Sequence, residues 1–325
     1  MRAPGTRALL VAALAAASLA VPAASAMAAP VTIDLCALPG VLQPLPATAP
    51  ATSIPVWGFG VPTTPGNCAT ATASVPGPLL SVAQGDVVTL RVTNALPAGH
   101  PLRVEIPGID FAPGPTDAAV GTTVIRSFTA SAPGTYAYQS AGNDGRQIAM
   151  GLAGALVVRP PTANQAYGDP ASAYDVEAPT VLGAVDPAFN AAPDTYDLHA
   201  YRATYWLING RSYPDTAPVT ASAGQRVLLR YVNTGYDNTT MLLLGMHERV
   251  LARDARPLPG PVDAAAETIP AGATEDAIAT VPATAPPSAH GFPLYNRQLH
   301  LTNGAQTGPT PAPASGGGML TFIQP

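Results

Sequence analysis

Apolar and polar residues alternate in short runs along much of the chain, and a glycine stands shortly before several of these runs. In the segment 85–94, Val88, Leu90 and Val92 alternate with threonine and arginine. A period of two is typical of a β-strand with one buried face, and the glycine permits the turn before it. The same pattern recurs at 224–233, with five of the ten residues identical at a constant offset of 139. Each copy therefore predicts a turn followed by a half-buried strand.

The ends of two consecutive units also correspond. Apolar segments at 133–138 and 154–158 close the first unit, and similar segments at 289–295 and 318–323 close the second. Many short strands separated by turns favour β-sandwiches with Greek-key connections. The pattern therefore predicts an all-β fold built from one kind of unit used twice.

These units define the predicted domain organisation. The first sandwich is expected at 29–160 and the second at 201–325. Between them, the segment 161–200 has the proline and turn residues of a connector, and it contains one extended strand across 174–186.

The composition agrees with this fold and excludes some functions. Of 325 residues, 38 are proline and 30 are glycine, a density that disfavours long helices. Apolar residues make up 47% of the chain and charged residues 11%, which predicts a folded protein rather than a disordered one. The net charge is −5 and there is no basic block, so binding to nucleic acid is not expected.

The first 28 residues have the pattern of a secretion signal. Arg2 and Arg7 supply positive charge, the segment 8–21 is apolar, and small residues at 24–28 suit cleavage at 26–28. We therefore expect an exported protein, either secreted or located in the periplasm or at the cell surface. No later stretch is long and apolar enough to predict a membrane span.

The chain has two cysteines, Cys36 and Cys68. Because an exported protein meets oxidising conditions, we expect them to form a disulfide. The alternative is a pair of thiolate metal ligands, which the absence of a nearby histidine in the sequence disfavours.

Several segments together resemble the cupredoxin domains of the multicopper oxidase superfamily, which includes laccase-like and nitrite-reductase-like proteins. The resemblance covers the chain from about residue 70 to the end. It rests on Val75-Pro76-Gly77-Pro78-Leu79-Leu80, Pro133-Gly134-Thr135-Tyr136-Ala137-Tyr138, the segment 151–158, Leu207-Ile208-Asn209-Gly210, the segment 227–233 and Val250-Leu251-Ala252-Arg253-Asp254. It implies two consecutive cupredoxin-like sandwiches.

The resemblance does not extend to the residues that bind copper in that family. The family holds a three-copper cluster with His-x-His pairs, and the corresponding positions here carry Glu105 and Pro107 in one segment and Gln139 and Ala141 in another. The mononuclear copper of the family needs a Cys thiolate in a late His-Cys-His segment, and neither cysteine lies in one. We therefore expect degenerate copper sites, no catalytic residue of the family and no bound metal.

The five histidines are scattered along the sequence. We expect His100 in an exposed loop, His199 as a polar residue of the connector, His290 in a proline-rich turn and His300 at a solvent-facing strand position. His247 differs, because Met246 precedes it.

Met246 and His247, with Met241 nearby, supply the soft ligands that suit Cu(I). The competing interpretation is that the segment 241–244 is a core strand in which methionine fills space.

Two further groups of residues were candidates for chemistry or binding. The carboxylates of Asp110, Asp117, Glu275 and Asp276 are best explained as exposed loop charges, since their spacing does not place two of them across a substrate. Aromatic residues cluster at 201–206, where they would form either a binding surface or the contact between the two domains.

The sequence thus supports three hypotheses of function. The first is an exported protein with degenerate copper sites and a binding, structural or accessory role toward an unidentified protein or cell-surface partner. The second is a copper-dependent, laccase-like oxidoreductase that completes its copper sites between subunits of an oligomer. The third is a copper carrier that uses Met246 and His247.

Overall fold

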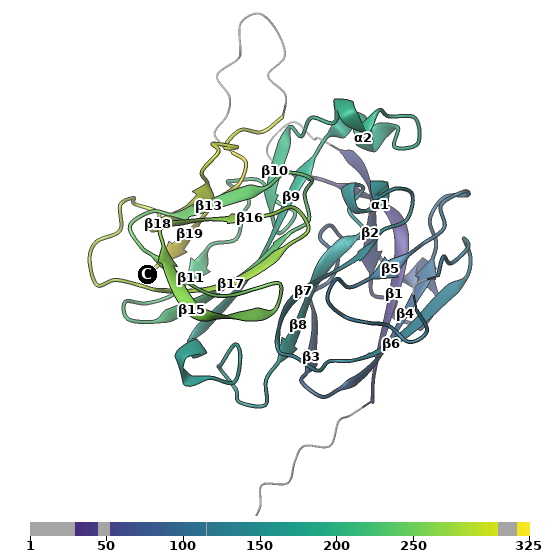
Figure 1. Cartoon of the computed structure of the whole chain (residues 1–325). Coiled ribbons are helices and arrows are strands. Elements are labelled where there is room, and N and C mark those ends of the chain that lie inside the picture. The colour runs from purple at the N-terminus through teal and green to yellow at the C-terminus, as the bar shows by residue number, and fades with distance from the viewer. Residues whose placement is uncertain (1–29, 45–52, 115, 305–316) are drawn as a thin grey trace, which may run out of the picture.

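The chain folds into two β-sandwiches that lie side by side (Figure 1). The computed structural model describes residues 30–44, 53–114, 116–304 and 317–325, so the predicted signal peptide at 1–28 lies outside the described residues. Among the helices of the described part, none has the length and apolar character needed to cross a membrane.

The first domain consists of two four-stranded sheets, with strand orders β2-β1-β4-β6 and β3-β8-β7-β5. Their strands are β1 (Pro30–Leu42), β2 (Ile54–Gly60), β3 (Leu80–Ala83), β4 (Val87–Asn94), β5 (Val104–Glu105), β6 (Thr123–Thr129), β7 (Gly134–Ser140) and β8 (Ala153–Arg159). A short helix, α1 (Arg146–Ala149), follows β7. Apolar residues from the inner faces of both sheets form one core, as the alternating pattern predicts.

The second domain has a six-stranded sheet, β10-β9-β12-β17-β14-β15, and a five-stranded sheet, β11-β19-β18-β13-β16. The strands are β9 (Val176–Val185), β10 (Tyr205–Ile208), β11 (Val219–Thr220), β12 (Arg226–Asn233), β13 (Thr239–Leu243), β14 (Glu248–Arg253), β15 (Arg256–Ala264), β16 (Ala266–Ile269), β17 (Thr274–Thr280), β18 (Phe292–Asn296) and β19 (Leu320–Gln324). The predicted all-β fold of two sandwiches is therefore confirmed.

The strand expected within the connector is β9. It pairs in parallel with β12 and antiparallel with β10, so it is an inner strand of the second domain's larger sheet. The helix α2 (Pro187–Ala191) follows it and packs against β2 of the first domain.

The two copies of the repeated sequence pattern form equivalent strands in the two domains. The first copy forms β4 and the second forms β12, and each strand ends in a buried asparagine, Asn94 or Asn233. The Nδ2 of Asn94 donates to two carbonyl oxygens at 2.9 Å, and the Nδ2 of Asn233 does the same. Each side chain therefore ties the end of a central strand to two neighbouring segments, at a position where a buried amide must find partners.

The two copies differ in burial. β4 is buried on its inner face alone, as predicted, but every residue of β12 after Arg226 is buried. The prediction of a half-buried strand is therefore wrong for the second copy. The reason is that β7 of the first domain packs against β12 and β17, which covers the face that would otherwise meet water.

Arg230 of β12 lies at the centre of this interface. Its side chain is 1% exposed, and its Nε is 2.6 Å from Glu177 Oε1 while its Nη1 is 3.2 Å from Asp276 Oδ2. Nη1 also donates to Thr135 Oγ1 of the first domain at 2.9 Å, and Thr135 donates to Asp276 at 2.6 Å. Arg159 of the first domain also binds Glu177, with its Nη2 2.7 Å from Glu177 Oε2. The contact between the domains is thus a buried ionic network.

A second group of carboxyls lies inside the second domain. Glu248 and Glu275 are 1% and 2% exposed, and each has one carboxyl oxygen without a hydrogen-bond partner. Burial raises the pKa of Glu248 to about 8, although the hydroxyl of Tyr231 donates to it at 2.8 Å. Burial also raises the pKa of Glu275 to about 7, against the effect of Arg253. Glu267 faces the same group and raises both pKa values further.

The prediction that Glu275 and Asp276 are exposed loop charges is wrong. Both residues lie in β17 and are almost fully buried. Successive residues of a strand point to opposite faces, so Glu275 enters the second domain while Asp276 meets the first domain. By contrast, Asp117 is 46% exposed and pairs with Arg103 at 2.7 Å, as a surface charge does.

The expected disulfide is confirmed between Cys36 of β1 and Cys68, which begins the short 3₁₀ turn η1 (Cys68–Thr70). The described residues contain no free cysteine. The bond closes a loop across 32 residues and ties this turn to the fully buried Cys36.

Removal of the disulfide should destabilise the protein. In the chain-entropy account, opening a loop of this length lowers the free energy of unfolding by about 3–4 kcal/mol. The measurement is chemical denaturation of Cys36→Ser, Cys68→Ser and the double variant. The double variant should lose no more than either single variant, and a loss that simply adds would contradict the bonded pair.

Replacing Arg230 by methionine should lower the free energy of unfolding by about 3–5 kcal/mol, because Asp276 is left buried without its cation, while Glu177 keeps only Arg159. Arg91 is the matched control, since it holds the same position in the first copy but is 38% exposed and contacts Asp34 at 3.4 Å. Arg91→Met should cost about 0–1 kcal/mol. Equal losses in the two variants would show that burial at the interface does not matter.

The buried carboxyls predict greater stability in acid than in weak alkali. Folding raises their pKa values above the ordinary 4.5. Their contribution to the free energy of unfolding is therefore fully present below pH 4.5 and is lost as the pH rises through 7 and 8. The free energy of unfolding should fall over pH 5–7 by up to about 1.4 kcal/mol per pH unit for each carboxyl. Denaturation at several pH values should show a shallower decline in Glu248→Gln, and an unchanged one in the surface control Asp263→Asn.

Candidate functional site

Two of the four residues that we expected at copper-ligand positions are in direct contact. Glu105 of β5 and Gln139 of β7 face each other as antiparallel partners. The amide Nε2 of Gln139 donates to the carboxylate Oε1 of Glu105 at 2.7 Å, and Gln139 is 9% exposed. The side chains at these positions therefore bind each other.

The other two positions carry side chains without a donor atom. Pro107 lies in the turn after β5, directly before Gly108, whose φ of 85° suits a glycine. Ala141 follows β7, and its backbone N–H donates to the carbonyl oxygen of Arg103 at 2.9 Å. Neither a pyrrolidine ring nor a methyl group has a lone pair to give to a metal.

The residues present at these positions do not fit copper. Copper sites in proteins use imidazole, thiolate and thioether ligands, whereas this set consists of a carboxylate, an amide, a proline and an alanine. Both thiols are already joined in the disulfide. Within the ranges that the structure describes, no group of three or more His, Cys, Asp or Glu side chains is arranged to hold a metal ion.

His100 and His300 lie elsewhere than the sequence indicated. His100 is 7% exposed, with its ring 4.5 Å from that of Trp57 and its Nε2 3.4 Å from Asp194. His300 lies outside the strands and is only partly exposed. Its ring stacks on that of Trp206, with the ring centres 4.3 Å apart. Burial lowers the pKa of His300. Both expectations are wrong for one reason, which is that an aromatic residue distant in sequence covers each ring.

The other two scattered histidines are on the surface. His199 lies in the 3₁₀ turn η3 (Leu198–Ala200), where its Nδ1 is 3.0 Å from the carboxylate of Asp197. His290 is exposed in its turn, beside the ring of Phe322.

The soft-ligand candidates differ in their burial. Met241 and Met246 are buried in the core of the second domain, 0% and 5% exposed. His247, in the turn between β13 and β14, is exposed. The two methionines therefore fill space in the core, whereas His247 is at the surface.

A groove lies beside Pro107, where the domains meet. Its volume is about 210 Å³. Pro107, Gly108 and Tyr136 of the first domain line one side, and Asp254 and Arg256 of the second domain line the other. Tyr136 is nearly buried, and its hydroxyl donates to a backbone carbonyl at 3.0 Å, while the guanidinium of Arg256 is exposed. The groove thus offers an aromatic wall and charges of both signs.

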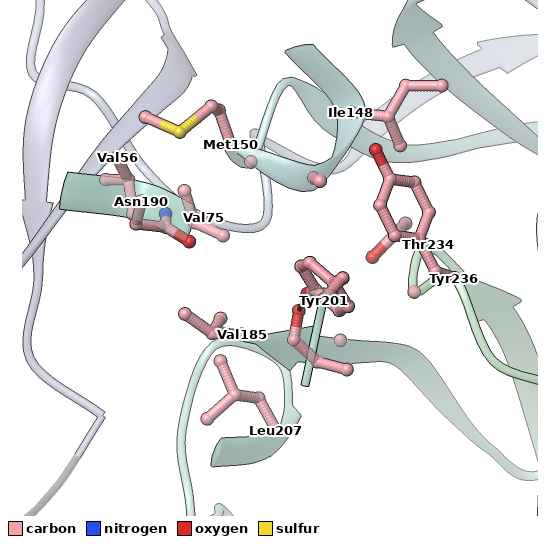
Figure 2. Close-up of a pocket in the computed structure, with 15 residues that line it drawn as sticks. Val56, Val75, Ile148, Met150, Val185, Asn190, Tyr201, Leu207, Thr234 and Tyr236 are labelled. Atoms are coloured by element: carbon pink, nitrogen blue, oxygen red, sulfur yellow. Dashed lines mark hydrogen bonds between the residues drawn. The ribbon is translucent and has the colours of Figure 1, made fainter. Parts of the chain in front are cut away.

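A second, more enclosed pocket lies between the domains (Figure 2). Its walls are mainly apolar, with Val56 and Met150 from the first domain and Val185 and Leu207 from the second. Tyr201 also lines it, and its hydroxyl donates to a backbone carbonyl at 2.9 Å. The aromatic cluster at 201–206 therefore contributes to the contact between the domains.

The sequence pointed to neither cavity. Each one is assembled from segments that are far apart in the chain. Some lining residues, such as Tyr136 and Leu207, belong to segments that predicted the fold, but those segments did not indicate a cavity. The sequence had drawn attention to Pro107 and to the aromatic residues at 201–206 for other reasons.

Comparison with known proteins places the fold. Residues 62–163 match the family model described as multicopper oxidase. A search of the curated proteins finds no match.

Solved structures of copper proteins share the architecture at low sequence identity. A blue copper oxidase from Nitrosomonas europaea is 21% identical, with a TM-score of 0.74 over 91% of this chain and 86% of that one. The multicopper oxidase mgLAC is also 21% identical, with a TM-score of 0.72 and the same coverage. A copper nitrite reductase from Nitrosomonas europaea is 17% identical, with a TM-score of 0.66 over 90% of this chain and 94% of that one.

The resemblance found in the sequence is therefore confirmed: residues 62–163 match the family model of the multicopper oxidases, and the chain has the cupredoxin-like fold of these copper proteins.

Proposed function

We propose that this protein is an exported relative of the multicopper oxidases that has kept their scaffold and lost their copper sites. Its role is then binding, structural or accessory, outside the cytoplasm. The observation that carries the proposal is the hydrogen bond between Gln139 and Glu105, because it occupies two of the positions where the family holds copper.

The donor chemistry supports this proposal independently of any bound ion. Of the four residues at these positions, Glu105 alone carries a charged ligand group, and its Oε1 already accepts a hydrogen bond from Gln139. The side chains of Pro107 and Ala141 contribute no ligand atom. A copper that cycles between oxidation states prefers imidazole and sulfur ligands to a single carboxylate. Electron transfer through this position is therefore not part of the proposed function.

The groove beside Pro107 is the surface that the proposed binding role would use. It lies at a domain junction, where ligand sites commonly occur, and it combines Tyr136 with the charged Asp254 and Arg256. Export is supported by the signal pattern at 1–28 and by the disulfide, which is typical of oxidising compartments. The partner is then a protein or a component of the cell surface.

The second candidate is a copper-dependent oxidoreductase that completes its sites with ligands from another subunit. It is favoured by the similar structures, whose titles name copper oxidases and a copper nitrite reductase. It differs from the first candidate in needing an oligomer, bound copper and an oxidase activity. The burial of Met246 in the core, next to an exposed His247, favours the packing role of this methionine over the copper-carrier hypothesis.

Copper binding by the mature protein distinguishes these candidates. We expect substoichiometric copper after the protein is loaded with Cu(II), dialysed and analysed for metal, and no oxygen-coupled oxidation of a phenol. The matched variant carries Glu105→His, Pro107→His, Gln139→His and Ala141→His, which places imidazoles at all four positions. It should retain more copper than the natural chain.

Stoichiometric, tightly held copper in the natural chain would overturn the proposal. If that copper came with an oligomer and with phenol oxidation, the second candidate would be correct instead.

A further inference from the structure

The enclosed pocket between the domains has one unusual polar group. Asn190 of α2 is 2% exposed, and its Oδ1 is buried without a hydrogen-bond partner. Figure 2 shows this oxygen turned toward the pocket. A buried acceptor without a donor is costly, so such groups in folded proteins usually have a partner.

The orientation of this amide is determined by its other end. The Nδ2 of Asn190 donates to the carbonyl oxygen of Pro55, in β2 of the first domain, at 2.9 Å. Exchanging the nitrogen and oxygen would bring two acceptors together and break this bond. The pocket therefore presents an acceptor, and it does so because α2 is held against the first domain.

The hydroxyl groups around the pocket have no proton to offer to that acceptor. Tyr201 donates to Ala184 at 2.9 Å, and Thr234 donates its hydroxyl proton to Leu182 at 3.0 Å. Tyr236 donates across the domain boundary to the carbonyl oxygen of Gly145 at 3.2 Å. A molecule that satisfies Asn190 must therefore bring its own donor.

The size and charge of the pocket limit that molecule further. The cavity measures about 30 Å³, and a smaller one of about 20 Å³ shares Val75, Gly183 and Leu207 with it. A water molecule needs roughly 10–15 Å³ by this measure, so the two cavities together have room for only a few heavy atoms. No charged side chain lines either cavity, which favours a neutral molecule.

We propose that this pocket is a binding site for a small neutral molecule with one hydrogen-bond donor on a short apolar body, of the class of the short-chain alcohols. The donor binds Asn190 Oδ1, and the apolar part packs against Val185, Leu207 and Val56. Tyr236, which is 36% exposed and bridges the domains, also lines the pocket. This site does not depend on the proposed loss of copper.

The test compares two probes of the same number of heavy atoms, 2-propanol and acetone. The first carries a hydroxyl donor and the second carries none. Each is titrated into the isotope-labelled mature protein while backbone amide shifts are recorded by NMR. We expect saturable shifts at the pocket with 2-propanol, and binding of acetone that is about tenfold weaker, as the loss of one hydrogen bond to a buried acceptor predicts.

Two variants and a control assign the binding to this pocket. Asn190→Leu removes the acceptor, so it should abolish the preference for 2-propanol. Gly183→Ala adds a methyl group at the wall shared by both cavities, at ordinary contact distances of 3.8 Å from Leu207 and 3.9 Å from Thr234, and should weaken both probes. Gly260→Ala, on the exposed strand β15 with no atom near its added methyl, should change nothing.

The outcomes decide the proposal even if Asn190→Leu does not fold. Absence of saturable shifts would mean that the pocket holds water only, and would overturn it. Equal affinities for 2-propanol and acetone, or binding that Gly183→Ala leaves unchanged, would overturn it as well. None of these results bears on the copper experiment, so the two proposals fail separately.

Discussion

The relative position of the two domains depends on one buried charge. Arg230 has lost nearly all of its hydration, so its guanidinium is stable only where carboxylates and hydroxyls surround it. Glu177 and Asp276 supply the opposite charge from the second domain, while Thr135 reaches the same cluster from the first. Because these directed contacts tolerate little rotation of one sandwich against the other, they hold the walls of both interdomain cavities in place.

The repeated strand pattern shows how the same residue type differs between the two domains. Arg91 and Arg230 occupy the same position in the two copies of the strand pattern, yet Arg91 is partly in water and Arg230 is not. The same residue type therefore serves as a surface charge in one domain and as an interface anchor in the other. The difference arises from the neighbour that packs on the strand, since the strands themselves are alike.

Each sandwich is held together by contacts among its own residues. Each sandwich has its own apolar core, the disulfide ties the turn at Cys68 to β1, and buried asparagines secure the ends of both central strands. A fold of this kind does not by itself determine a function, which depends on the sites that it carries. The two cavities between the domains are candidate sites of this kind.

The sequence by itself determined the strands, the plan of two sandwiches, the disulfide and the absence of any His-x-His pair. These follow from period-two alternation, from turn glycines, from a single possible pair of cysteines and from residue type, all of which are local properties. Only the tertiary structure decided that both faces of β12 are buried and that His100 and Asp276 lie in the protein interior. It also decided that the side-chain oxygen of Asn190 faces a pocket without a hydrogen-bond partner. The physical reason is that burial and pairing depend on which distant segments come together, and nothing in the local pattern of β12 or around Asn190 encodes the neighbour that covers it.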